Sequence, residues 1–385
     1  MSIKFAIIKE RKNPPDRRVV FSPTALLQAK KQFPNAIFKV EASDIRVFSD
    51  KAYQEAGFEV STNISDCDVL IGVKEVPVEH LIPNKKYFFF SHTIKKQPYN
   101  RKLLKAILDK NIALYDHETI VNAKGFRLIG FGRYAGIVGT YNGFRAWGLK
   151  YDAFNLPKAE TLHDQKKLIT VLNTLELPNI KILLTGSGKV ANGAQEMLEG
   201  MHLKSVSVED YLHKTFSEPV YCKIDVLDYN KRKDGAVKDV FDFFDHPQEY
   251  VSDFMRFAKV TDYYIAGHFY GNGAPYFYTK EDVKSPDFNI KVVADISCDV
   301  NGPIATTIKA STIADPVFGY DKETGLEIDY KASNAIAVMS VDNLPCELPK
   351  DASEGFGEMF LQHVIPAFFN NDKDGVLARA KMTEN

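Results

Sequence analysis

An α/β fold with two doubly wound, Rossmann-like domains and a cleft between them is predicted from three observations. Apolar runs of strand length alternate with helix-like segments over residues 1–125, which is typical of a parallel sheet with helices on its faces. A second series of the same kind starts near residue 179. The chain has 385 residues, a length that suits two domains of roughly 150 residues each.

The first series supplies about five strand–helix units. IKFAIIKE is the first expected strand, and PTALLQAKKQF follows as a helix with Ser22 and Pro23 at its start. The further expected strands are AIFKVEAS, DVLIGVKEV, KYFFFSHT and IALYDHETIV, and the intervening helices are SDKAYQEAG and RKLLKAILDKN.

A glycine-rich helix is expected to lead from the first domain to the second. Residues 133–150, RYAGIVGTYNGFRAWGLK, combine glycine and alanine with large apolar side chains, which favours close packing on a neighbour. A polar helical stretch then ends in a linker before residue 179. The second series is expected to contain strands at ILLTG, SVSV, DYYIAG, NIKVVADIS and NAIAVMSV, with one long helical region through VSDFMRFAKV.

The composition excludes several classes of partner. The chain has 49 Lys and Arg against 50 Asp and Glu, a formal net charge of −1, so no general attraction to nucleic acids or anionic membranes is expected. The four cysteines lie far apart, which predicts neither a metal site nor a disulfide framework. No segment reaches the about 18 uninterrupted apolar residues of a membrane span, and the N-terminus does not resemble a signal peptide. We therefore expect a cytoplasmic protein that acts on a small molecule.

The stretch ILLTGSGKVANGA carries a dinucleotide-binding pattern. Gly186 and Gly188 follow a strand and precede a helix, where a tight turn lets the backbone approach a pyrophosphate at the helix N-terminus. Ala191 replaces the third glycine of the pattern. Glu209 lies at about the ~20-residue spacing expected of an acid that binds the ribose hydroxyls and disfavours a 2′-phosphate, with Asp210 beside it. The pattern favours NAD and leaves NADP as the alternative; a plain pair of turn glycines is the structural alternative.

Ionisable side chains follow two neighbouring expected strands. Lys74 and Glu75 end DVLIGVKEV, and His92 ends KYFFFSHT. Ligands bind outside the carboxyl ends of strands in open parallel sheets, so these side chains are candidates for one site. A buried lysine near an imidazole can be tuned for proton transfer near neutral pH. The structural alternative is a solvated lysine and a histidine that only caps the turn.

Several motifs together resemble a known family. KERKNPPDRRVVFSP, GVKEVP, FFFSHTIKKQ, ALYDHETI, GFGRYAG and VDNLPCELPKDASEGFG are similar to the lysine-forming saccharopine dehydrogenases and to the lysine–2-oxoglutarate reductase part of bifunctional lysine-degrading enzymes. The wider superfamily contains alanine dehydrogenase and the nicotinamide-binding transhydrogenase subunit. The resemblance implies an NAD(P)-dependent oxidoreductase that forms or cleaves saccharopine. It also implies a substrate domain at 1–135, completed by the segment 336–385, and a dinucleotide-binding domain with its connecting helix at 136–335.

The resemblance implies roles for individual residues. Lys74 and His92 match the acid–base pair. The matches around the substrate are Arg18, Glu75, Lys95, Glu118 and Arg127, and Arg133 is a weaker candidate for binding a carboxylate. The expected cofactor-binding residues are Gly186, Gly188, Lys189, Val190, Glu209, Asp295 and Asp299. Structural alternatives are that Arg127 only pairs with Glu118 and that Asp295 only caps a helix.

The chain also departs from the family. Val190 stands where saccharopine dehydrogenase carries a cysteine, and the region 211–285, with the aromatic loop HFYGNGAPYFYTK, matches no motif of the family. Two other functions therefore remain open. One is an alanine dehydrogenase-like enzyme, which needs fewer carboxylate anchors than the spread of basic residues here indicates. The other is a non-catalytic nucleotide-binding protein, which the presence of both Lys74 and His92 disfavours. The direction of the reaction and any homo-oligomer stay undetermined.

Overall fold

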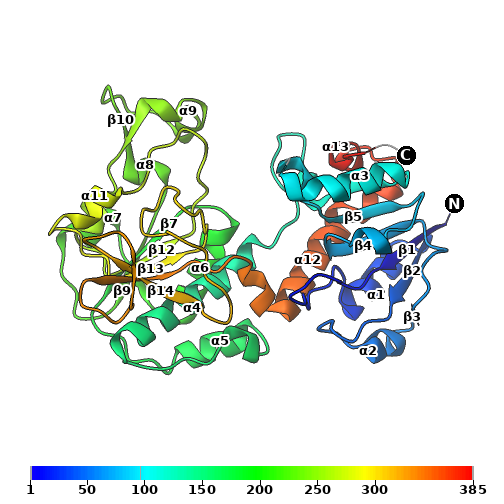
Figure 1. Cartoon of the computed structure of the whole chain (residues 1–385), viewed down its shortest axis with the longest axis horizontal. Helices are drawn as coiled ribbons and strands as arrows, with labels where there is room; N and C mark the ends of the chain where they lie inside the picture. Colours follow the sequence, from blue (N-terminus) through cyan, green and yellow to red (C-terminus); the bar gives the residue numbers. More distant parts are fainter. Residues whose placement is uncertain (1, 96, 384–385) are drawn as a thin grey trace. The chain divides into compact units, whose positions relative to one another are not determined.

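The chain is divided into two units, each with its own sheet and core. The computed structural model describes residues 2–95 and 97–383 (Figure 1). Unit 1 consists of Met1–Phe131 and Pro349–Asn385, and unit 2 of Gly132–Leu348. The chain therefore leaves unit 1 once and returns to it near its C-terminus.

Unit 1 is built on a six-stranded parallel sheet. The strand order is β3-β2-β1-β4-β5-β6, which is the order of a complete doubly wound sheet. The strands are β1 (Ile3–Ile7), β2 (Ala36–Glu41), β3 (Glu59–Ser61), β4 (Val69–Lys74), β5 (Lys86–Phe90) and β6 (Ala113–Asp116). The order reverses between β1 and β4, so the carboxyl ends of these two strands flank the point at which such sheets bind ligands.

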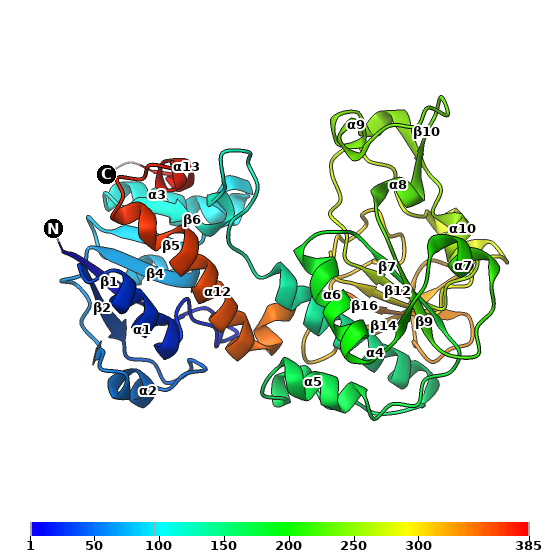
Figure 2. The same ribbon diagram turned by 180° about the vertical axis from the view of Figure 1, so that it is seen from behind.

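Helices cover both faces of this sheet (Figure 2). Successive strand residues point to opposite faces, so Phe5 and Ile7 join one core with α1 and α12, whereas Ala6 and Ile8 join another with α3. The helices are α1 (Pro23–Gln32), α2 (Asp50–Glu55), α3 (Arg101–Asp109), α12 (Pro349–His363) and α13 (Val376–Ala380). Short 3₁₀ turns lie at η1 (Val78–His80), η2 (Thr93–Lys95), η3 (Pro98–Asn100), η4 (His117–Thr119) and η8 (Ile365–Phe368). The C-terminal helices thus complete a core that the N-terminal residues begin.

Unit 2 contains an eight-stranded sheet in the order β15-β14-β16-β13-β12-β7-β9-β8. The strands are β7 (Lys181–Thr185), β8 (Lys204–Ser205), β9 (Val220–Ile224), β12 (Tyr263–Ala266), β13 (Val292–Asp295), β14 (Val317–Asp321), β15 (Glu327–Ile328) and β16 (Ala335–Met339). The pairs from β8 to β16 are parallel, and β14 is antiparallel to both of its neighbours. A separate antiparallel ribbon, β10 (Asn230–Arg232) with β11 (Tyr250–Ser252), extends away from this sheet (Figure 1).

The helices of unit 2 include one long helix and several short ones. They are α4 (Gly132–Tyr151), α5 (Gln165–Leu172), α6 (Lys189–Gly200), α7 (Val208–His213), α8 (Val226–Tyr229), α9 (Val240–Asp245), α10 (Met255–Ala258) and α11 (Lys280–Lys284), with 3₁₀ turns η5 (Ala159–Thr161), η6 (Pro247–Glu249) and η7 (Leu344–Glu347). The expected glycine-rich helix corresponds to α4. Its glycines allow a very close crossing with α6, because a Cβ on Gly136 would lie 2.0 Å from the Val190 carbonyl oxygen.

Two expectations for the second half of the chain are wrong. The long helical region expected before residue 260 is instead a mixture that contains β9, the ribbon β10–β11 and three short helices. The strand β9 is short and has Lys223 within it, so its sequence carries a weak strand signal. The returning segment also begins later than residue 336, because β16 pairs with β13 and β14 in the sheet of unit 2 and the return starts at Pro349.

Candidate active site

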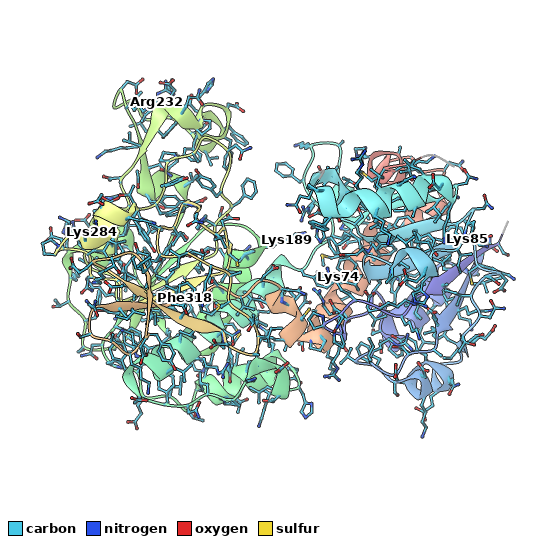
Figure 3. All side chains as sticks on the ribbon, viewed as in Figure 1. Lys74, Lys85, Lys189, Arg232, Lys284 and Phe318 are labelled. Carbon is cyan, nitrogen blue, oxygen red and sulfur yellow. The ribbon has the colours of Figure 1, made fainter. Side chains whose placement is uncertain are left out.

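Lys74 and His92 lie at the same edge of the unit 1 sheet. Lys74 is the last residue of β4 and pairs in register with Phe90, the last residue of β5. His92 follows two residues later with a left-handed φ of 55°. Because the two strands are parallel neighbours, their carboxyl ends meet at one edge. Figure 3 labels Lys74 at this edge.

The backbone around His92 is fixed by buried hydrogen bonds. The Ser91 N–H donates to Asp116 Oδ2 (3.1 Å), and the Ser91 hydroxyl also bonds this carboxylate, which ends the neighbouring strand β6. The Asn100 side-chain amide donates to the His92 carbonyl (2.9 Å). These contacts hold the left-handed turn from which the imidazole projects, so the position of His92 is set by the ends of β5 and β6 together.

Glu118 links the imidazole to an arginine. Its Oε1 lies 3.6 Å from His92 Nδ1 and 3.5 Å from Arg127 Nη2. The Arg127 Nε also donates to the Glu118 carbonyl (3.3 Å). The Glu118 side chain is 11% exposed, whereas that of Arg127 is 52% exposed. The structural alternative for Arg127, a pair with Glu118, is therefore observed, and about half of the guanidinium side chain still faces solvent.

Glu75 is paired with a lysine of the β1–α1 loop. Lys12 Nζ donates to Glu75 Oε1 (2.8 Å). Burial alone raises the pKa of Glu75, but the hydrogen bond from Lys12, together with the charges of Lys12 and His92, lowers the pKa overall. Glu75 is therefore a carboxylate at neutral pH, and it adds negative charge beside Lys74 and His92.

Arg18 is buried and held by an acid of its own loop. Its Nε and Nη2 donate to the two oxygens of Asp16 (3.0 and 2.6 Å), and its guanidinium stacks on Phe131, 4.3 Å from the ring centre. The backbone of Lys95 ends η2, and its side chain lies outside the described part of the structure. Arg133, a weaker candidate for binding a carboxylate, belongs to unit 2, where it donates to Glu196 (2.6 Å) and Gln165 (3.2 Å).

The glycine loop of unit 2 has the geometry that the sequence predicts. Gly186 follows β7 with a φ of +106°, and a Cβ there would lie 2.7 Å from the Gly267 carbonyl oxygen. Gly188 is the N-cap of α6 without a side-chain cap, and no atom lies within 4 Å of the position that its Cβ would take. The backbone N–H groups of the first turn, at Lys189 and Val190, thus begin a helix whose N-terminus is open to an anion.

Ala191 allows the start of α6 to pack closely on a neighbouring loop. Its backbone contacts the loop after β12, since a Cβ on Gly267 would lie 3.1 Å from Ala191 Cα. His268 follows in this loop and bonds Thr185, the last residue of β7, through Nδ1 (3.0 Å). The start of the aromatic segment HFYGNGAPYFYTK therefore packs against the glycine loop, a contact between distant segments that the sequence pattern does not reveal.

The acid at the neighbouring strand is not the expected one. Glu209 lies in α7, its side chain is 82% exposed, and it pairs with His213 (3.7 Å). The strand next to β7 is β9, not β8, and Asp225 follows β9 directly. Asp225 also starts α8, because it accepts a hydrogen bond from the Val226 N–H (2.8 Å). Recognising β9 as a strand is the signal that would have identified Asp225.

The aspartates after β13 serve the local turn. Asp295 is fully buried and accepts hydrogen bonds from Ser297 (N–H and hydroxyl), the Cys298 N–H and the Thr307 hydroxyl (2.6 Å). Burial raises the pKa of Asp295, and these bonds oppose that shift. No helix begins among the described residues between β13 and β14, so Asp295 holds a turn here and does not cap a helix, which was the alternative left open by the sequence. Asp299 lies on the exposed turn that follows.

A metal-binding cluster and a membrane-spanning helix are both absent from the described part of the chain. Over residues 2–95 and 97–383, no group of three or more His, Cys, Asp or Glu side chains has the arrangement needed to hold a metal ion. Within the same residues, no helix combines the length and the apolar character that crossing a membrane requires.

The fold and the two sites define a two-unit α/β protein of the doubly wound class, and comparison with known proteins places it more closely. Residues 6–138 match the family model described as "Alanine dehydrogenase/PNT, N-terminal domain". The solved structure of an L-alanine dehydrogenase superposes with a TM-score of 0.64 at 15% identity, covering 99% of this chain and 95% of that one. A transhydrogenase from Sinorhizobium meliloti gives a TM-score of 0.60 at 14% identity, with 99% and 98% covered.

Sequence relatives have more specific names. The chain is 29% identical over 405 residues to the mitochondrial alpha-aminoadipic semialdehyde synthase of Bos taurus, and the match covers 93% of this chain and 43% of that protein. It is 25% identical over 389 residues to the saccharopine dehydrogenase [NAD(+), L-lysine-forming] of Candida glabrata, with 97% and 96% covered. The chain thus spans less than half the length of the first relative and nearly the whole of the second. Its first third thus resembles the alanine dehydrogenase/transhydrogenase N-terminal domain, and over most of its length the chain is similar to these saccharopine enzymes.

Proposed function

We propose that the chain is an NAD(P)-dependent oxidoreductase of lysine metabolism that forms or cleaves saccharopine. The observation that carries the proposal is the cluster of Lys74, His92, Glu118 and Arg127 at the carboxyl edge of the unit 1 sheet. The open glycine loop of unit 2 supports a dinucleotide, and the names of the sequence relatives support the substrate.

The reaction requires proton transfers, which Lys74 and His92 of this cluster can perform. The side-chain amine of lysine adds to the ketone of 2-oxoglutarate, the carbinolamine loses water to form an imine, and reduction with NADH and a proton gives saccharopine and NAD⁺. Lys74 and His92 carry the protons at the carbinolamine, since both side chains project from one sheet edge. Glu118 orients the imidazole through its Nδ1. When bound, the nicotinamide supplies the hydride.

Arginine is the residue best suited to the carboxylates of this substrate. Arg127 is the better anchor, because half of its side chain is exposed. Arg18 is buried against Asp16 and Phe131, so it is the less accessible of the two arginines. Arg133 stays the weaker candidate, because Glu196 and Gln165 already accept hydrogen bonds from its guanidinium.

The choice of cofactor is assigned to Asp225 in this proposal. An acid after the strand next to the glycine-loop strand can bind both ribose hydroxyls and repels a 2′-phosphate. Asp225 has that place in the sheet, whereas Glu209 is exposed on α7. NAD is therefore the expected cofactor, with NADP the weaker alternative.

The test is NADH oxidation by the purified protein with lysine and 2-oxoglutarate. Turnover is expected with this pair, and Lys74→Met is expected to lose at least about 100-fold in kcat, because general acid–base groups typically contribute 10²–10⁴-fold. Turnover only with pyruvate and ammonia would assign the chain to alanine dehydrogenase-like chemistry. Binding of NADH without turnover of either pair would favour a nucleotide-binding protein that is not a catalyst.

The cofactor assignment has its own test. Asp225→Ser is expected to raise the KM for NADH by about 10–100-fold, the effect of losing hydrogen bonds to a charged group, and to narrow the preference for NADH over NADPH. Glu209→Gln is the comparison variant. If Glu209→Gln raises the KM for NADH and Asp225→Ser does not, the ribose contact belongs to Glu209.

A further inference from the structure

The end of β4 departs from a regular strand just before Lys74. Ile71 pairs with Phe88 of β5, and the next pair is Lys74 with Phe90. Three steps along β4 therefore match two steps along β5, so β4 contains one extra residue. In such a bulge the backbone groups of the extra residue leave the ladder and need other partners.

Two buried side chains supply these partners. The Glu10 carboxylate accepts the Val73 N–H through Oε1 (2.7 Å) and the Lys74 N–H through Oε2 (2.9 Å). His117 Nε2 lies 2.8 Å from the Gly72 carbonyl oxygen, and because a carbonyl only accepts, the imidazole is the donor. Three consecutive residues, 72 to 74, are thus held from two sides by side chains that are almost fully buried.

Steric contacts fix the same backbone. A Cβ on Gly72 would lie 2.9 Å from Ile8 Cδ1 and 3.4 Å from Glu10 Oε1, so the bulge packs directly against the end of β1. The His117 ring contacts Phe90 (5.0 Å between centroids) and Phe356 (5.2 Å). Neither side chain can follow a shift of the bulge without disturbing the core, and the bulge cannot relax on its own.

We propose that Glu10 and His117 are positioning residues for Lys74, because they hold the bulged end of β4 in the one backbone form that places this lysine at the sheet edge beside His92. Neither residue is needed as a proton carrier for the substrate. The inference rests on the proposed function of Lys74, and it adds two residues that neither composition nor motif spacing identifies.

The charge states suit these roles. Burial raises the pKa of Glu10 to about 7, and the charge of Asp16 adds to this shift. The two hydrogen bonds from backbone N–H groups and the charge of Arg18 lower the pKa and so oppose the shift. Only the carboxylate form has both oxygens available as full acceptors, so one of the two bonds to the bulge weakens when Glu10 is protonated. Burial lowers the pKa of His117 to about 4, so this imidazole stays neutral over the range in which Glu10 titrates.

The experiment compares wild type, Glu10→Gln and Glu347→Gln in the lysine and 2-oxoglutarate assay. A glutamine keeps one acceptor but turns an NH₂ toward the second N–H, so kcat is expected to fall about 10–100-fold at pH 8, the usual result of a small misplacement of a catalytic group. At pH 6 the wild type has itself lost one full acceptor, so the ratio of wild-type to variant kcat is expected to be smaller. The KM for NADH is expected to stay unchanged.

Glu347→Gln is the matched control. Glu347 is a buried acid of unit 2 whose pKa burial raises to about 7, but it does not touch β4. The ratio of wild-type kcat to Glu347→Gln kcat is expected to be the same at pH 6 and pH 8. A flat ratio for Glu10→Gln as well, or wild-type kcat in this variant, would overturn the proposal.

Amide hydrogen exchange gives a readout that needs no turnover. The amides of Val73 and Lys74 are expected to exchange faster in Glu10→Gln and in His117→Phe, which keeps a ring beside Phe90 and Phe356 but has no donor. Unchanged protection at both amides in the two variants would refute the positioning role. If the wild type is inactive with every substrate pair, the proposed function fails, and the exchange data still decide whether Glu10 and His117 hold the bulge.

Discussion

At the scale of single residues, the two arginines of unit 1 show how burial changes what a guanidinium can do. Arg18 is 3% exposed and fully engaged with Asp16, whereas the side chain of Arg127 is 52% exposed and lies at the longer distance of 3.5 Å from Glu118. Both carry the same charge, but a buried pair is part of the folded core, and a half-exposed one can exchange its partner for a ligand.

Alanine substitutions should separate these roles. Arg127→Ala is expected to raise the KM for 2-oxoglutarate by about 10–100-fold and to change the free energy of unfolding by less than about 1 kcal/mol, since exposed ion pairs contribute little. Arg18→Ala is expected to destabilise the protein by about 3–5 kcal/mol, because it removes the guanidinium that pairs with the buried Asp16 carboxylate. Steady-state kinetics and urea unfolding check both, and equal losses of stability would contradict the assignment.

Buried acids also make stability depend on pH. The Glu347 side chain accepts a hydrogen bond from Asn142 (2.8 Å), and burial raises the pKa of Glu347 from 4.5 to about 7. Between these values the unfolded chain releases this proton while the folded chain keeps it. The stabilising contribution is therefore complete below pH 4.5 and is lost as the pH rises through 7, by up to about 3 kcal/mol.

The measurement is urea unfolding of wild type and Glu347→Gln at several pH values. His117 and His268 act in the opposite sense, because burial lowers their pKa values to about 4 and about 3, so their contribution is lost as the pH falls below 6.5. The difference between the two proteins removes these shared terms. The free energy of unfolding of Glu347→Gln is expected to rise relative to that of wild type as the pH increases from 4.5 to 7. A constant difference between the two free energies would show that Glu347 does not titrate in this range.

At the scale of elements, the α4–α6 crossing and the glycine loop use glycine for different reasons. A Cβ on Gly136 would lie 2.0 Å from the Val190 carbonyl oxygen, and one on Gly193 would lie 2.0 Å from that of Arg133. These contacts are between backbones, so no side chain can move aside. Gly188, by contrast, faces open space. The missing side chain at this position leaves room for a ligand, whereas the missing side chains of Gly136 and Gly193 leave room for a neighbouring helix.

Alanine at these positions is expected to give opposite results. Gly136→Ala should destabilise the protein by at least about 1–3 kcal/mol, the usual cost of overpacking, with the KM for NADH affected only through stability. Gly188→Ala should leave the free energy of unfolding within about 0.5 kcal/mol and weaken NADH binding. Urea unfolding and NADH titration measure both, and normal NADH affinity in Gly188→Ala would argue against a pyrophosphate at this helix end.

Element-scale patterns explain which parts of the site were predictable. Lys74, His92 and the glycine loop follow clear apolar strands, so their places could be assigned from local sequence. Glu10 and Asp225 could not, because their roles depend on which strands are neighbours in the sheet. The strand β9 lies within the long helical region that was expected from the sequence, and Glu209 was chosen by spacing alone.

At the scale of the whole molecule, two units with separate cores share one chain that passes between them twice. Units of this kind commonly unfold as separate cooperative steps. Because the glycine loop belongs to unit 2, NADH is expected to stabilise that unit by about 2.7 kcal/mol at 100 times its Kd. Scanning calorimetry should show one transition move with NADH and the other remain. A single transition that shifts as a whole would show that the units unfold together.

The sequence by itself determined the fold class, the resemblance to the saccharopine enzymes and the positions of the proposed acid–base pair and the glycine motif at strand ends, because these depend on local periodicity and on short motifs. Only the tertiary structure decided that Asp225 follows the strand beside the glycine-loop strand and that Arg133 bonds Glu196 and Gln165 of unit 2. It also showed that Glu10 and His117 form hydrogen bonds with the bulged backbone at the end of β4. Strand order and the pairing of buried polar groups join residues that are far apart in the chain, and no local pattern encodes those contacts.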